Sequence, residues 1–134
     1  MKRHHFLRAI AAAALACTLA PAWGQAYPNK PVRVIIPFPP GGTLDFIGRT
    51  LAQKMSEQTG QTFVIENKPG GNGFIGADAV AKAPADGYTL LFNASTFTTG
   101  PMVVKSAPYN VNRDFTPVVL VAQAPLAVSV NNDL

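Results

Sequence analysis

The sequence changes character sharply at Gly41 and Gly42. Residues 32–37 are almost continuously apolar, as is typical of a strand buried on both faces of a parallel sheet. Beyond the two glycines, apolar residues recur at helical spacing as far as Met55, and Gly60 stands where a glycine commonly ends a helix. This stretch predicts a strand, a tight turn and a helix in direct succession.

A strand-to-helix turn of this kind can hold a small anion. The first N–H groups of a helix have no acceptor inside it, and they lie at the positive end of the helix dipole. Glycines let a ligand approach the backbone closely. Thr43 can cap the helix or offer a hydroxyl, and Asp45 adds an acceptor in the first turn. The opposing interpretation is that the glycines only provide turn geometry and that Asp45 only complements the dipole.

The same succession continues along the chain. Residues 62–66 and 88–92 predict two further strands, and residues 74–83 predict a helix between them. The β-α-β-α-β order implies parallel strands joined by helical crossovers. Ligands bind beyond the carboxyl ends of such strands, so the expected site combines three loops, residues 38–45, 69–73 and 93–99.

Regularity weakens after Gly100. Residues 102–109 predict a short helix or an irregular segment, and residues 126–130 predict another strand. No closing helix or capping signal follows. We therefore expect the chain to be a piece of a longer protein.

The first 26 residues predict a secretory signal peptide. A basic start precedes an alanine-rich apolar run of about 12 residues, which is shorter than the roughly 20 that a membrane-spanning helix needs. Small residues at Gly24 and Ala26 favour cleavage before Tyr27 and export. Two alternatives remain, an uncleaved membrane anchor and a lipoprotein site at Cys17.

Charge and residue types exclude several kinds of function. Removing the signal peptide removes three of the 11 basic residues and no acidic one, which leaves 8 against 7 and lowers the formal charge from +4 to +1. The remaining basic residues form no stripe, so nucleic-acid binding has no support. The mature chain contains no histidine or cysteine, so we predict no catalytic residues, no metal site and no cofactor.

Five motifs resemble those of Bug-type extracytoplasmic solute receptors, the periplasmic binding proteins of tripartite tricarboxylate transporters. They are residues 27–45 (YPNKPVRVIIPFPPGGTLD), 66–71 (ENKPGG), 76–78 (GAD), 83–91 (APADGYTLL), and Tyr109 with 114–117 (DFTP). The resemblance implies an α/β periplasmic-binding-protein fold of the Venus-flytrap, type II-like class. Residues 27–134 would form the N-terminal part of its first domain and end near the crossover to a second domain.

The resemblance also implies a monomeric receptor that is not an enzyme. It would bind a di- or tricarboxylate, an amino acid or an aromatic acid, and deliver it to the membrane components of the transporter. The implied ligand-binding residues lie in two loops and are Phe38, Pro40, Gly41, Gly42, Thr43, Asp45, Asn93, Ala94, Ser95 and Thr96.

Two other classes of function compete with this interpretation. One is an α/β hydrolase or transferase whose catalytic residues lie beyond residue 134. The other is a structural or interaction module in which the glycine loops are only turns.

Overall fold

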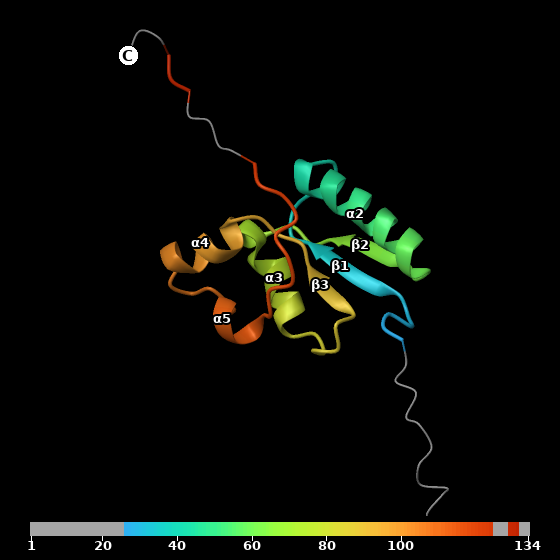
Figure 1. Ribbon diagram of the computed structural model, residues 1–134. Helices are drawn as coiled ribbons and strands as arrows, with labels where there is room; N and C mark the ends of the chain where they lie inside the picture. Colours follow the sequence, from blue (N-terminus) through green and yellow to red (C-terminus); the bar gives the residue numbers. More distant parts are fainter. Residues whose placement is uncertain (1–25, 125–128, 132–134) are drawn as a thin grey trace, which may run out of the picture.

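The computed structural model describes residues 26–124 and 129–131, and these form a parallel sheet with helices on both faces (Figure 1). The sheet has three strands in the order β2-β1-β3. The strands are β1 (Val32–Ile36), β2 (Phe63–Asn67) and β3 (Thr89–Leu91). Both neighbours run parallel to β1, with Val34 opposite Ile65 on one side and Leu90 on the other. The predicted fold class is confirmed.

Helix α2 (Thr43–Thr59) covers one face of the sheet. Val32 and Val34 of β1 pack with Ala52 of α2 and Phe63 of β2 in the buried core on this side. Gly48 brings α2 so close to β1 that an added Cβ would lie 2.6 Å from Ile36 Cδ1. Gly60 ends the helix in the left-handed conformation, as its sequence position predicts.

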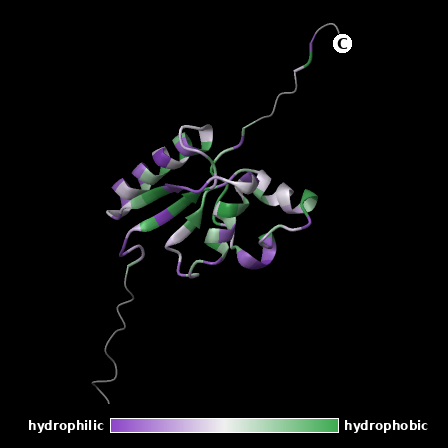
Figure 2. Ribbon diagram, turned by 180° about the vertical axis from the view of Figure 1, so that it is seen from behind, coloured by the Kyte–Doolittle hydropathy of each residue, from purple (hydrophilic) through white to green (hydrophobic). Residues whose placement is uncertain are grey.

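Helix α3 (Phe74–Ala81) covers the opposite face of the sheet. Consecutive side chains of an extended chain point to opposite faces, and accordingly Ile36 contacts α2 whereas Pro37 contacts α3. An added Cβ at Gly76 would lie 2.7 Å from Pro37 Cβ, so α3 rests directly on the end of β1. Figure 2 shows the strands as mainly apolar, whereas hydrophilic residues lie along the outer side of α2.

Two further helices, α4 (Thr96–Val103) and α5 (Val111–Asp114), lie beyond α3 (Figure 1). An aromatic cluster joins them to the sheet layers. Tyr109 stacks on Phe97 with ring centroids 5.2 Å apart and meets the edges of Phe74 and Phe115. Its hydroxyl donates a hydrogen bond to the carbonyl of Phe97 at 3.0 Å.

The structure corrects the sequence prediction beyond β3. The polar tract after residue 93 contains the start of α4, so this helix begins six residues before the predicted position at Met102. Threonines with hydroxyls bonded back to Ser95 form its first turn, which is how a polar segment becomes helical. The strand predicted at residues 126–130 falls mostly outside the described residues.

Among the helices of the described residues, none has both the length and the apolar character needed to cross a bilayer.

Candidate functional site

The three predicted loops all leave the sheet at the carboxyl ends of its strands, because every strand is parallel. The chain passes from β1 to β2 on one side and then crosses back to β3 on the other. The strand order therefore reverses between β1 and β3, where open α/β sheets bind ligands. The loops that flank this point are the β1–α2 loop and the β3–α4 loop.

The β1–α2 loop exposes Pro40, Gly41, Gly42 and Thr43, while Phe38 is half-buried. Gly41 has φ +85°, a conformation that glycine adopts without strain. Gly42 is the N-cap of α2 and makes no side-chain cap, so the predicted capping role of Thr43 is wrong: Thr43 is the first helical residue. The first helical bond runs from the amide of Phe46 to the carbonyl of Gly42.

These contacts leave several amides at the start of α2 available. In the described part of the chain, the N–H groups of Gly42, Thr43 and Leu44 donate no hydrogen bond. Unpaired amides at a helix N-terminus, in the field of the helix dipole, favour a negatively charged group. Binding of an anion by these main-chain amides stays a prediction.

Gly41 and Asp45, two of the predicted ligand-binding residues, bond to each other. The amide of Gly41 donates to Asp45 Oδ2 at 3.0 Å. Asp45 Oδ2 also accepts from Arg49 Nε at 3.0 Å, and Asp45 Oδ1 accepts from Asn67 Nδ2 at 2.9 Å. The Asp45 side chain is 7% exposed. Its contacts favour a role in holding the loop, and direct ligand contact by Asp45 stays a prediction.

The same hydrogen bonds fix the charge of Asp45. Its pKa lies far below the usual range, chiefly because of the hydrogen bond from Arg49, with further contributions from the Gly41 amide and Asn67. The hydrogen bond to Asp45 raises the pKa of Arg49. Both groups are therefore ionised at neutral pH, and their charges cancel beside the glycine turn.

The β3–α4 loop supplies the second group of predicted residues. Ala94 and Ser95 are exposed, and the amide of Ala94 donates to Asn93 Oδ1 at 2.8 Å. Ser95 is the N-cap of α4 and makes no side-chain cap. Thr96 Oγ1 is a buried atom without a hydrogen-bond partner among the described residues, so its hydroxyl has unused bonding capacity.

The third predicted loop, residues 69–73, lies after β2 on the other side of β1. Gly70, Gly71 and Gly73 all have positive φ, and Asn72 is left-handed as well. The tip of the Phe38 ring lies beside Gly73. This loop therefore supports the β1–α2 loop.

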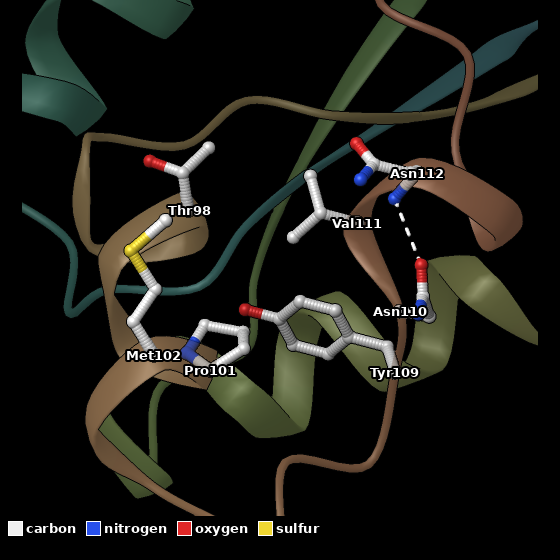
Figure 3. A pocket seen from close by; sticks show the side chains of 7 residues that line it. All are labelled: Thr98, Pro101, Met102, Tyr109, Asn110, Val111 and Asn112. Carbon is white, nitrogen blue, oxygen red and sulfur yellow. Dashed lines mark hydrogen bonds between the residues drawn. The ribbon is translucent and has the colours of Figure 1, made fainter.

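A cavity of about 360 Å³ lies elsewhere, between α4 and α5 (Figure 3). Thr98, Pro101 and Met102 line it from α4, and Tyr109 forms its other wall. The hydroxyls of Thr98 and Tyr109 both donate to backbone carbonyls. Asn110, Val111 and Asn112 complete the lining, and no lining residue belongs to the glycine turn.

Within residues 26–124 and 129–131, no group of three His, Cys, Asp or Glu side chains gathers in a way that could hold a metal ion.

Sequence reasoning missed Asn67 and Arg49 as members of this region. The predicted strand ends at residue 66, just before Asn67, and the predicted site does not include Arg49, yet both side chains bond to Asp45. The spacing Asp45–Arg49 is a helical i,i+4 pair and could have been found, whereas the Asn67 contact depends on the pairing of β2 with β1.

The fold and the loop arrangement fit the periplasmic-binding-protein class, and comparison with known proteins assigns the chain to it. Residues 47–134 match the family described as tripartite tricarboxylate transporter family receptor, and the chain belongs to this family. The family is one of receptors, so the enzyme interpretation is set aside and the expectation of a non-enzyme is confirmed.

Individual relatives agree with this assignment. The chain is 43% identical over 129 residues to a protein from the tcbD-tcbE intergenic region of Pseudomonas sp. strain P51, covering 94% of this chain and 38% of the relative. It is 42% identical over 117 residues to BugT of Bordetella pertussis, covering 86% and 36%. The chain thus spans less than two-fifths of the length of these relatives.

The solved structure of the periplasmic binding protein BugD is similar with a TM-score of 0.60 and 42% sequence identity. The match covers 63% of this chain and 28% of BugD. A second structure, described as a periplasmic transporter, has a TM-score of 0.58 and 46% identity over 63% of this chain and 29% of that one.

Proposed function

We propose that this chain contributes the carboxylate-binding loops of a periplasmic solute receptor for a tripartite tricarboxylate transporter. The observation that carries the proposal is the row of unpaired amides at Gly42, Thr43 and Leu44, which lies beside the point where the strand order reverses. The family assignment supplies the class of protein, and its description names tricarboxylates as the transported solutes.

The ligand-binding residues of this proposal come from two loops. The β1–α2 loop contributes the amides after Gly41 and the exposed surface of Phe38 and Pro40, while the β3–α4 loop contributes Asn93, Ala94, Ser95 and Thr96. A carboxylate held by charge-assisted hydrogen bonds gains about 1.5–3 kcal/mol from each. Three such bonds, with two helix N-termini, are sufficient for micromolar binding, about 8 kcal/mol.

Gly42 offers a direct test because it tolerates a side chain. Its φ is −81°, and an added Cβ would meet only the carbonyl oxygen of Pro39, at 3.8 Å. Gly42→Ala therefore keeps the fold but places a methyl group where a ligand must approach the backbone. Loss of one charge-assisted hydrogen bond corresponds to a roughly 10- to 150-fold increase in Kd.

The experiment is a thermal-shift and calorimetric screen of the intact protein against di- and tricarboxylates, amino acids and aromatic acids. Stabilisation by a carboxylate without turnover, with weaker binding in Gly42→Ala and unchanged binding in Gln53→Ala on the outer side of α2, supports the proposal. Silence with every carboxylate contradicts it, and so does equal affinity in Gly42→Ala.

The proposal includes the cellular address and the partners. We infer that the signal peptide of residues 1–26 directs export, that residues 27–134 form the N-terminal part of the first of two domains, and that a monomer delivers its ligand to the membrane components. N-terminal sequencing of protein recovered from the periplasm should begin at Tyr27. A lipid on Cys17 would show the lipoprotein alternative instead.

A further inference from the structure

Asn67 uses its whole side-chain amide to join three parts of the chain. Its Nδ2 donates to the carbonyl of Phe38 at 3.1 Å and to Asp45 Oδ1 at 2.9 Å. Its Oδ1 accepts from Arg49 at 3.0 Å. Because Asn67 ends β2 directly beside Ile36, it anchors both the entry to the glycine turn and the first two turns of α2 to the sheet.

Asp45 determines which amides of the turn remain available. Its carboxylate accepts a hydrogen bond from the N–H of Gly41. The N–H groups of Gly42, Thr43 and Leu44 donate no hydrogen bond within the described part of the chain. A carboxylate in this position has an electrostatic disadvantage, because it lies in the same helical turn that would receive an anion. An unpaired negative charge here would repel the ligand.

Arg49 removes that disadvantage. Its Nε lies 3.0 Å from Asp45 Oδ2, one helical turn farther from the glycines, and its other end donates to Asn67. The Asp45–Arg49 pair therefore has no net charge, while the hydrogen bonds of Asp45 still shape the turn. The two functions of this cluster, geometry and charge cancellation, belong to different residues.

We propose that Asn67 and Arg49 are positioning residues for anion binding: Asn67 fixes the turn through Phe38 and Asp45, and Arg49 cancels the charge of Asp45. This inference rests on the proposed function of the β1–α2 loop. Neither residue needs to touch the ligand.

The test separates charge from geometry by calorimetry of the intact protein with citrate, succinate and benzoate as probes. Arg49→Gln should weaken binding about tenfold or more because Asp45 is left unpaired. The double variant Asp45→Asn with Arg49→Gln should recover most of that loss, since no net charge then remains at the turn. Asn67→Ala should weaken binding without rescue by Asp45→Asn.

Lys54→Gln is the matched control. It removes the same charge from the same helix, but Lys54 pairs with Glu57 on the outer side. Equal affinities of Arg49→Gln and Lys54→Gln would overturn the charge role. A double variant that binds no better than Arg49→Gln would overturn it too.

A second readout keeps this inference distinct from the proposed function. In amide NMR spectra, Asn67→Ala and Arg49→Gln should both shift the resonances of Gly41 and Gly42, while Lys54→Gln should leave them in place. Absence of binding by any probe to the wild-type protein, with these shifts observed, defeats the proposed function alone. Unchanged Gly41 and Gly42 resonances in Asn67→Ala overturn the positioning role itself.

Discussion

Asn67 Nδ2 lies 2.9 Å from Asp45 Oδ1, and this hydrogen bond joins the end of β2 to the first turn of α2 across 22 residues of sequence. With the bonds from Gly41 and Arg49, it satisfies a carboxylate that is almost completely buried. The contact makes the glycine turn part of the sheet framework.

Replacing Asn67 by alanine should destabilise the protein measurably. The substitution removes the hydrogen bonds that Asn67 Nδ2 donates to the Phe38 carbonyl and to Asp45 Oδ1, both of which are part-buried. We therefore expect the free energy of unfolding to fall by about 1–3 kcal/mol. Urea unfolding measures this change. Asn112→Ala, at an exposed position in α5, is the control and should stay within about 0.5 kcal/mol. Equal stability of the two variants would contradict the structural role of Asn67.

Asp45 should make stability depend on pH in the acid range. Its folded-state pKa is lowered, chiefly by the hydrogen bond from Arg49 and also by those from the Gly41 amide and Asn67. The stabilisation that ionised Asp45 gives the folded state is therefore fully present above the unfolded-state pKa near 4. That contribution is lost as pH falls further and the folded carboxylate takes up a proton.

The comparison of wild type with Asp45→Asn isolates this effect from Glu66, Asp86 and Asp114, whose pKa values are also lowered. Urea unfolding from pH 7 to pH 3 should show a stability difference that is largest above pH 5 and narrows below about pH 4. A difference that stays constant with pH would show that ionised Asp45 contributes nothing.

Gly76→Ala should be strongly destabilising. The new Cβ would lie 2.7 Å from Pro37 Cβ and 3.0 Å from the backbone oxygen of Lys68, and this backbone atom cannot move aside as a flexible side chain does. We expect a cost of about 1–3 kcal/mol from overpacking, measured by thermal unfolding. Gly42→Ala has open space and should melt close to wild type, so similar losses in both variants would refute the packing argument.

Thr96→Val should change stability and binding in opposite directions. The substitution replaces a buried hydroxyl that has no partner among the described residues, so the fold should be unchanged or more stable by about 1 kcal/mol. If the hydroxyl bonds to the ligand when it binds, Kd should rise severalfold. Thermal melting and calorimetry on one variant measure both effects, and Thr98→Val in the same helix is the control for binding.

Local pattern was sufficient for most of the fold. Three features depend only on neighbours along the chain: the apolar run of β1, the helical spacing in α2 and the glycine that ends α2 at Gly60. The structure places each of them within a residue or two of the predicted position. The start of α4 was missed because its first turn contains threonines bonded to a backbone carbonyl, a pattern that resembles a polar loop in sequence.

The candidate site was predictable only in outline. The β-α-β-α-β order determined that the loops after β1 and β3 end at one edge, and the paired glycines indicated an exposed backbone there. Which amides stay free was decided by Asp45 and its partner Asn67, because parallel pairing of β1 with β2 brings residues distant in sequence into hydrogen-bonding range. The sequence by itself determined the order of strands and turns, since these follow from short-range spacing, whereas the direction of each donor at the turn required the packed sheet.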